Sequence, residues 1–297
     1  MPASPSTPQQ LLEKIDPRAG PLIITVFGDT IKPRGEKIWL GDLINLMQPF
    51  GLSERLVRTG VYRLSQEHWL ASKQIGRRSY YEITSDGLTT FAHATSRIYA
   101  LAPRPWDGKW LLVQALPNAS AEHRKALRQV LTWRGFGQLS PTLLIKPGVS
   151  PKATSQLLAS EKLSSYVGLF TSDLDKFSDP LTIAKNSWAL KEFSQSYDQL
   201  IADFSQVDEH FCKTQQDAFL VRSLLIHQYR RILLKDPQLP AQLLPKNWAG
   251  NKARHRVAEL YKLLTPQADL YIERHTIDKD GTPYPVPQDY TDRFAAS

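Results

Sequence analysis

The sequence has 297 residues, 41% of them hydrophobic and 22% charged, a balance typical of a globular protein with room for two or three domains. Its net charge of +8 favours a polyanionic partner, such as nucleic acid, a phosphate-bearing ligand or an anionic membrane surface. The single cysteine, Cys212, excludes an intramolecular disulfide and any multi-cysteine metal site. Because no apolar run resembles a signal peptide or a membrane span, we expect a reduced, soluble protein of the cytoplasm with no membrane partner.

The distribution of prolines, glycines and polar residues predicts three domains between two irregular ends. The opening residues are rich in Pro, Ser and Gln, and the stretch DKDGTPYPVPQDY near the other end is expected to lack regular structure. The predicted division is a flexible tail over 1–19, domains over 20–100, 105–175 and 180–275, and a tail or arm over 276–297.

A helix-turn-helix is predicted in the first domain. Ser53 is a favoured N-cap residue, and the segment after it has helical periodicity at about 100° per residue. Its apolar side, expected to pack on a preceding helix within WLGDLINLMQPF, consists of Leu56, Val57, Gly60, Val61 and Leu64. Its opposite side consists of Arg55, Arg58, Thr59, Tyr62 and Gln66, with Arg63 on the flank.

A β-hairpin is predicted next. WLASKQI and SYYEIT have strand-like composition, and GRR joins them. Such a hairpin would carry Arg77 and Arg78 at its tip, with Tyr80 or Tyr81 nearby. A helix-turn-helix followed by a hairpin is a winged helix, whose second helix enters the major groove and whose wing contacts phosphate or the minor groove.

The charge of this segment favours DNA binding. Between Arg55 and Arg78 six basic residues face one acidic residue, Glu67. Such a concentration of positive charge can bind the phosphate backbone of DNA, and arginine can donate hydrogen bonds to guanine. The alternatives are a solvated helix face and a winged helix that binds protein.

The second domain is expected to alternate strands and helices, as strand, helix, strand, helix, strand. The strands are expected in WLLVQALP, TLLIKP and YVGLF, and the first helix in SAEHRKALRQVLTWRG. The glycines of WRGFG are expected to form a turn or a close backbone approach, with Trp133 and Phe136 in the core.

The third domain is expected to be mainly helical and contains a second basic concentration. Between Arg222 and Lys262 there are nine basic and two acidic residues. Three interpretations remain open: further DNA contact, a phosphate site for an anionic effector, or solvated helix faces.

No catalytic residues, metal ligands or cofactor are predicted. The histidines show no HxxxH or HxH spacing, and the GxSxG, GxxxxGK[ST] and GxGxxG motifs are absent.

The chain resembles the PaaX family of bacterial transcriptional repressors of phenylacetic acid degradation. The resemblance lies in TVFGDTIKPRGEKIWLGDLI, GLSERLVRTGVYRL, GRRSYY, WRGFGQLSPTLLIKP and YRRILLKDPQLPAQLLPKNWAGNKAR, in the order that the family shows. It implies an α+β multidomain protein with an N-terminal winged helix of the GntR-like kind, a central ferredoxin-like (Cas2-like) domain and a mainly helical C-terminal domain.

The resemblance also implies a function. Members are repressors that bind palindromic operator DNA as homodimers and are released by the effector phenylacetyl-CoA. The match of SERLVRTGVYRL and GRRSYY assigns DNA contacts to Ser53, Arg55, Arg58, Thr59, Tyr62, Arg77, Arg78 and Tyr80, beside Arg63 on the helix flank. Coenzyme A carries several phosphates, so Trp248 and Arg254 of PKNWAGNKARHR are candidate effector contacts, through ring stacking and a phosphate contact respectively.

Two enzymatic alternatives are weaker. A nucleic-acid-processing enzyme with a Cas2-like nuclease domain needs carboxylates at the end of the first strand of that domain. Here Asp107 precedes the strand and Glu122 is the first acid after it. The other alternative is a CoA-thioester enzyme that also binds DNA. We expect that the protein is not an enzyme.

Overall fold

The structure is a computed structural model that describes residues 5–76, 78–100, 106–175, 178–276, 284 and 286–294, without the side chains of His93 and Asp289. Its backbone contacts form two compact units. Unit 1 consists of residues 1–101, 197–231 and 252–297, and unit 2 of residues 102–196 and 232–251. Helices and two small sheets are both present, so the mixed α+β class is confirmed.

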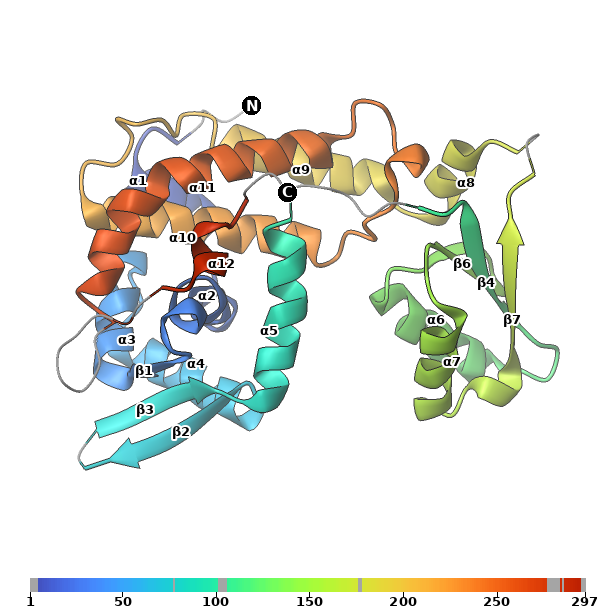
Figure 1. Cartoon of the computed structure of the whole chain (residues 1–297), viewed down its shortest axis with the longest axis horizontal. Helices are drawn as coiled ribbons and strands as arrows, with labels where there is room; N and C mark the ends of the chain where they lie inside the picture. The colour runs from blue at the N-terminus through green and yellow to red at the C-terminus, as the bar shows by residue number, and fades with distance from the viewer. Residues whose placement is uncertain are drawn as a thin grey trace. The chain divides into compact units, whose positions relative to one another are not determined.

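The N-terminal part of unit 1 contains the predicted DNA-binding segment (Figure 1). In chain order it consists of α1 (Pro8–Ile15), α2 (Ala19–Val26), the π-helical turn η1 (Phe27–Ile31), the 3-10 turn η2 (Lys32–Arg34), β1 (Lys37–Trp39), α3 (Leu40–Met47), the 3-10 turn η3 (Gln48–Phe50), α4 (Glu54–Gln66), β2 (Leu70–Ile75), β3 (Arg78–Ile83) and α5 (Ser85–Ile98).

Helix α1 lies in the segment expected to be a flexible tail, so that expectation is wrong for Pro8–Ile15. Thr7 caps the helix by accepting a hydrogen bond from the backbone N–H of Gln10 at 3.3 Å, and Pro8 occupies the first turn, where no intrahelical partner is needed. The apolar side chains of the helix, Leu11, Leu12 and Ile15, are buried. Helical spacing of these three residues outweighs the polar composition around them.

Two helices, α3 and α4, with the 3-10 turn η3 between them, occupy the segment where the helix-turn-helix was predicted. Ser53 is the N-cap of α4, as expected, and its hydroxyl accepts a hydrogen bond from the N–H of Leu56 at 3.4 Å. Four residues of the expected apolar side are buried, but Leu56 is 48% exposed, so its predicted burial is wrong. Helix α4 packs against α2 as well as α3, which the sequence did not indicate.

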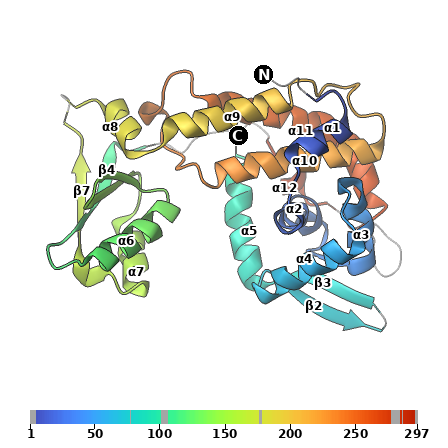
Figure 2. The ribbon, with the colours of Figure 1, turned by 180° about the vertical axis from the view of Figure 1, so that it is seen from behind.

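The predicted hairpin is also present. Strands β2 and β3 pair in antiparallel register from Leu70 opposite Ile83 to Ile75 opposite Arg78. Strand β1 pairs with the other edge of β3, so the sheet order is β1-β3-β2. Figure 2 shows this hairpin next to α4, with α5 leading away from it. Gly76 at the tip has a φ of 60°, a conformation that favours glycine.

Three long helices follow the central segment of the chain: α9 (Leu190–Asp203), α10 (Gln215–Leu233) and α11 (Ala249–Glu273). The parts that belong to unit 1 pack with the N-terminal elements; Phe219 of α10, for example, contacts Phe50 at the end of η3 with ring centroids 5.6 Å apart. A short helix, α12 (Gln288–Thr291), lies in the stretch expected to lack regular structure, so that expectation is wrong there. Tyr290, Arg293 and Phe294 of this C-terminal segment are buried.

Unit 2 has a ferredoxin-like arrangement. It contains β4 (Lys109–Ala115), α6 (Ala121–Trp133), β5 (Gly137–Ser140), β6 (Leu143–Pro147), α7 (Pro151–Ser160), η4 (Ser164–Tyr166), β7 (Val167–Asp173), α8 (Pro180–Ser187) and η5 (Ala241–Leu243). The antiparallel sheet has the order β5-β6-β4-β7. Alternate residues of β4 pack with α6 and α7 in one core, to which Val113, Leu127 and Leu158 belong.

Strand β5 was not predicted, because GQLS is short and half polar. The two glycines of WRGFG, Gly135 and Gly137, behave as expected. Gly135 has a φ of 81°, and a Cβ on Gly137 would lie 2.5 Å from the ring of Trp188. Phe136 is in the core, whereas Trp133 at the end of α6 is 87% exposed, so its predicted burial is wrong.

Candidate nucleic-acid interface

The outward face of α4 carries the side chains that the sequence assigned to DNA. All of them are exposed to solvent: Arg55, Arg58, Thr59, Tyr62 and Arg63. Tyr62 is 62% exposed, so its ring and hydroxyl group are accessible to a partner. The N-cap residue Ser53 is exposed at the start of the same helix. The thirteen-residue helix therefore presents a polar, largely basic surface on one side.

The opposite face of α4 fixes the position of this surface. Val57 and Val61 are fully buried, and Gly60 lies between them in sequence. A Cβ on Gly60 would lie 2.5 Å from Cδ1 of Ile23 in α2, so a glycine permits the close approach of the two helices. Helix α2 is thus the support on which α4 rests.

The hairpin contributes one described arginine. Arg78 is exposed, and its guanidinium lies 5.3 Å from the centre of the Trp39 ring, within range of a cation–π interaction. Arg77, the other predicted contact at the tip, lies outside the described residues. Tyr80 is 7% exposed and packs against Trp39 in the core. The predicted DNA contact of Tyr80 does not fit this position, because the alternation of β3 turns its side chain inward.

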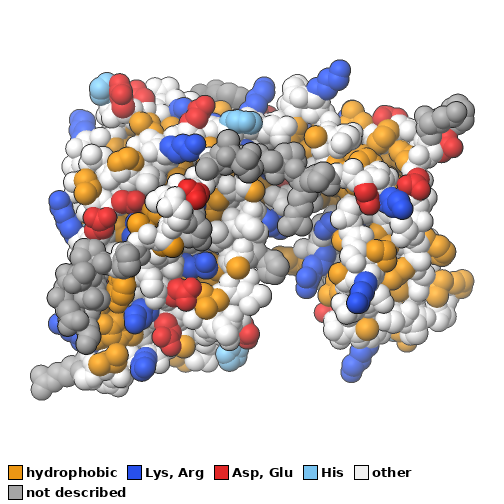
Figure 3. Space-filling view, viewed as in Figure 1, with side chains coloured by type: hydrophobic (Ala, Val, Ile, Leu, Met, Phe, Trp, Pro, Cys, Tyr) orange, Lys and Arg blue, Asp and Glu red, His pale blue; other side chains and the backbone are white. Residues whose placement is uncertain are grey.

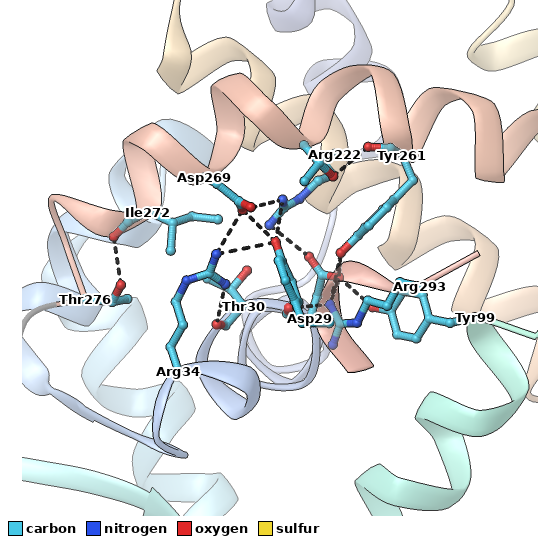
Figure 4. Close-up of polar contacts among 12 residues, drawn as sticks. Asp29, Thr30, Arg34, Tyr99, Arg222, Tyr261, Asp269, Ile272, Thr276 and Arg293 are labelled. Carbon is cyan, nitrogen blue, oxygen red and sulfur yellow. Dashed lines mark hydrogen bonds and ion pairs between the residues drawn. The ribbon is translucent and has the colours of Figure 1, made fainter. Parts of the chain in front are cut away.

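A buried polar network lies beneath the interface, at the π-helical turn that extends α2 (Figure 4). Asp29 accepts hydrogen bonds from the hydroxyl groups of Tyr99 and Tyr261 and from Nη1 of Arg293, the last at 3.1 Å. Arg222 of α10 lies 3.4 Å from the second carboxylate oxygen of Asp29. The network therefore joins η1 to α5, α10, α11 and the C-terminal segment.

Asp269 of α11 is the second acidic centre of this network. It accepts hydrogen bonds from Arg34 at 2.9 Å, from Arg222 at 2.8 Å and from the hydroxyl group of Tyr290 at 2.6 Å. Arg222 thus bridges both carboxylates. Three arginines face two carboxylates, an excess of one positive charge among almost fully buried groups.

Burial and pairing set the protonation states in the network. Burial alone would raise the pKa of Asp29, but the charges of Arg222 and Arg293 and the tyrosine hydrogen bonds hold it below its ordinary value. Burial raises the pKa of Tyr99 and Tyr261, so both remain protonated donors. The arrangement is a paired, hydrogen-bonded ion cluster of the kind that is costly to break.

A second polar contact joins α2 to α10. Thr25 donates its hydroxyl proton to the carbonyl of Pro21 and lies 3.0 Å from Nδ1 of His227, and Arg230 donates to the same hydroxyl at 2.7 Å. Burial, with the nearby charges of Arg230 and Arg231, lowers the pKa of His227 to about 3. His227 is therefore neutral at physiological pH.

The second basic concentration in the sequence is partly internal. Arg222 is fully buried in the network, Arg230 is bonded to α2, and Arg256 donates to the backbone carbonyl of Val207 at 2.9 Å. On the face in Figure 3, Lys and Arg side chains of the described residues are interspersed with Asp and Glu. Solvated or structural roles therefore account for a good part of this charge.

The two predicted effector contacts are placed in different units. Trp248 is 6% exposed and belongs to unit 2, whereas Arg254 is half-buried in unit 1. The predicted stacking of an effector ring on Trp248 does not fit this burial, because the indole is packed inside the protein. The phosphate-binding role of Arg254 stays a prediction.

Among the described residues there is neither a side-chain cluster that would hold a metal ion nor a helix that would span a membrane. In these parts of the chain, no group of three or more His, Cys, Asp or Glu side chains could hold a metal ion. Asp107, before β4, accepts a hydrogen bond from the backbone N–H of Lys109 at 3.0 Å. Of the helices that the structure describes, none is long and apolar enough to cross a membrane.

Sequence reasoning missed the polar network as a unit. Its members come from distant parts of the chain, and Arg222 resembled one more surface charge. The only signal was the stretch TVFGDTIKPRG, which contains Asp29 and Arg34 and takes part in the family resemblance.

Three protein-family models match successive segments of the chain. The sequence model described as PaaX-like protein matches residues 18–87, that of the PaaX protein central Cas2-like domain matches 103–184, and that of the PaaX-like protein C-terminal domain matches 188–274. The chain is 35% identical over 269 residues to the protein named Transcriptional repressor PaaX from Escherichia coli (strain K12), an alignment that covers 84% of this chain and 82% of that protein.

A solved structure has a related fold. The uncharacterized protein Rv0674 from Mycobacterium tuberculosis aligns with a TM-score of 0.57 at 20% identity, over 82% of this chain and 96% of that one. The three family models and the relative at 35% identity all point to the same family. The chain belongs to the PaaX-like family.

Proposed function

We propose that this protein is a transcriptional repressor of phenylacetate catabolic genes that binds operator DNA through α4 and the β2–β3 hairpin. One observation carries the proposal. The outward face of α4 exposes Arg55, Arg58, Thr59, Tyr62 and Arg63 in a chain that is 35% identical to a protein named as a transcriptional repressor.

The proposed docking is that of a winged helix. Helix α4 would enter the major groove, where arginine side chains can bind the N7 and O6 acceptors of guanine. Arg78 would contact the backbone or the minor groove beside it, with Arg77 as a further proposed contact. The order α3, η3, α4 and hairpin, with β1 completing the sheet, supports this assignment.

We further propose that two copies bind a palindromic operator and that phenylacetyl-CoA releases them. Release requires that the effector bind the DNA-incompetent state more tightly, and DNA then weakens effector binding by the same factor. A coupling of about 1–3 kcal/mol changes operator affinity roughly 5- to 150-fold. Arg254 remains a proposed contact for a phosphate of the effector.

Catalysis is not part of the proposal. The protein would act in the bacterial cytoplasm as a receptor, without a cofactor and without turnover of its effector. The absence of a carboxylate within β4, KWLLVQA, is consistent with a non-catalytic central domain.

The test is fluorescence anisotropy on promoter DNA from a phenylacetate catabolic gene cluster at fixed salt. Phenylacetyl-CoA, free phenylacetate and coenzyme A are titrated in parallel, and each compound is assayed for turnover. We expect tight binding of the promoter DNA and release by the thioester alone. If the promoter DNA binds but none of the three compounds releases it, the proposal that phenylacetyl-CoA is the effector is wrong. Equal affinity for promoter and scrambled DNA would contradict the proposed repressor function.

A further inference from the structure

One acidic side chain lies beside the arginines on the outward face of α4. Glu54 is the first residue of the helix, 59% exposed, one turn before Arg58, which is 56% exposed. Oε1 of Glu54 accepts a hydrogen bond from Nε of Arg58 at 2.8 Å and lies 2.6 Å from Nη2. The carboxylate thus occupies one edge of the guanidinium.

Stability alone gives this pair a small role. Exposed ion pairs contribute about 0–1 kcal/mol, and an acid in the first turn gains a similar amount from the helix dipole. Against DNA the same carboxylate is unfavourable, since it repels phosphate and lowers the net charge of the surface. The carboxylate therefore contributes little to folding, and Arg58 is the side chain that it contacts.

The geometry leaves the outer end of Arg58 available. Nη1 makes no hydrogen bond to a described residue, and the outer hydrogens of Nη1 and Nη2 point away from the edge that Glu54 occupies. Two parallel donors of this kind match the N7 and O6 acceptors of guanine. An arginine held in advance also loses less side-chain entropy when it binds.

We propose that Glu54 is a positioning residue that sets the base specificity of the interface by holding Arg58 for end-on contact with a guanine. The inference rests on the proposed DNA-binding function. In this arrangement Glu54 lowers the affinity for arbitrary DNA by its charge and raises the discrimination at one G·C pair through Arg58.

The experiment is a double-mutant cycle on binding specificity. Glu54→Ala, Arg58→Ala and the double variant are titrated by anisotropy with promoter DNA, with a scrambled duplex, and with promoter duplexes in which each G·C pair is replaced in turn. Full-length protein is used at one salt concentration. Glu13→Ala in α1, an exposed acid on another helix, controls for the change in net charge.

We expect Arg58→Ala to reduce discrimination at one G·C pair by about fivefold or more, the lower limit for a bidentate contact. Glu54→Ala leaves Arg58 in place and is expected to reduce discrimination at the same pair by about twofold or more, and to add nothing once Arg58→Ala is present. Glu54→Gln, whose amide oxygen still accepts from Nε, is expected to restore most of the discrimination while binding scrambled DNA more tightly than the parent. Glu13→Ala is expected to leave discrimination unchanged.

Two outcomes would overturn the inference. An equal loss of discrimination from Glu54→Ala in the parent protein and in the Arg58→Ala variant would mean that Glu54 contacts a base by itself. If Glu54→Ala leaves the discrimination unchanged at every G·C pair, the contact between Glu54 and Arg58 is a surface ion pair without a role in specificity. If the parent protein itself binds promoter and scrambled DNA equally, the proposed function fails as well. The two failures are distinguishable, because failure of the Glu54 inference alone leaves the parent protein specific for promoter DNA.

Discussion

At the scale of single residues, the amphipathic periodicity of α4 predicted which of its side chains are exposed and which are buried, apart from Leu56. Helical geometry alone separates Arg55 and Arg58 from Val57 and Val61, and the structure exposes the first pair and buries the second. The same reasoning failed for Tyr80, because in a two-residue alternation either Tyr80 or Tyr81 can face inward. Packing against Trp39 decides the choice, and Trp39 lies 41 residues earlier in the chain.

The proposed backbone contact of Arg78 can be measured through its salt dependence. We expect Arg78→Ala to weaken binding to promoter and scrambled DNA by a similar factor. If the side chain neutralises one phosphate, the slope of log K against log salt should fall in magnitude by about 1. Anisotropy titrations at several salt concentrations give the slope. Lys152→Ala, an exposed cation on α7, is the control; an equal change in both variants would remove Arg78 from the interface.

At the scale of elements, the interface depends on how closely α4 can approach α2. Local sequence predicted α4 from its N-cap and its periodicity, but not its main partner, since nothing in the sequence specifies contact between Gly60 and Ile23. The missed strand β5 has the same origin. Its four residues pair with β6 through tertiary context rather than through strand propensity.

Gly60→Ala tests the contact between the two helices. In an isolated helix alanine is more favourable than glycine by about 1 kcal/mol. Here the new methyl group meets Cδ1 of the fully buried Ile23, and overpacking of this kind costs about 1–3 kcal/mol. After the gain in helix propensity is subtracted, we expect a net loss of up to about 2 kcal/mol in the free energy of unfolding by urea. Ile23→Val makes room, and the double variant should be more stable than the sum of the single changes indicates. A stabilised Gly60→Ala would show that Ile23 accommodates the methyl group without cost.

The contact between α2 and α10 should respond to pH through His227. Its pKa is about 3 in the folded protein and near 6.5 in the unfolded chain, so the unfolded state binds the proton more readily. The stabilisation is present above pH 6.5 and is lost as the pH falls toward 3. Between pH 7 and pH 5 we expect a loss of about 2 kcal/mol from this group.

Urea denaturation at a series of pH values measures this effect, with His227→Asn as the comparison. The variant is expected to be less stable at pH 7, because a buried contact with Thr25 changes, but to lose less stability on acidification. His210, which is exposed, provides the matched control through His210→Asn. Parallel pH profiles for the parent and the His227 variant would contradict a buried neutral imidazole.

At the scale of the whole molecule, the sequence identified the kinds of element but not the long-range polar contacts. Asp29 is 264 residues from Arg293 in the chain, and no local pattern indicates such a partner. The C-terminal segment looked irregular from its prolines, yet Tyr290, Arg293 and Phe294 are buried in unit 1. Through Asp29 this segment contacts the turn that extends α2, the helix that supports α4.

Arg293→Ala tests whether this segment stabilises unit 1. The change leaves Asp29 with Arg222 as its remaining described cationic partner and removes a side chain that stacks on Tyr99 and Tyr290. Because Arg222 still pairs with Asp29, the cost comes from the buried oxygen atoms of Asp29 and Tyr261 that lose the hydrogen bonds of Arg293. Leaving buried polar groups unsatisfied costs about 1–3 kcal/mol, and we expect a loss of that size in urea denaturation. Asp292→Ala, one residue away and exposed, should cost less than about 0.5 kcal/mol. If both variants unfold at the parent's urea concentration, the C-terminal segment does not hold the turn beneath the interface, and α2 must be positioned by its contacts with α4 and α10 alone.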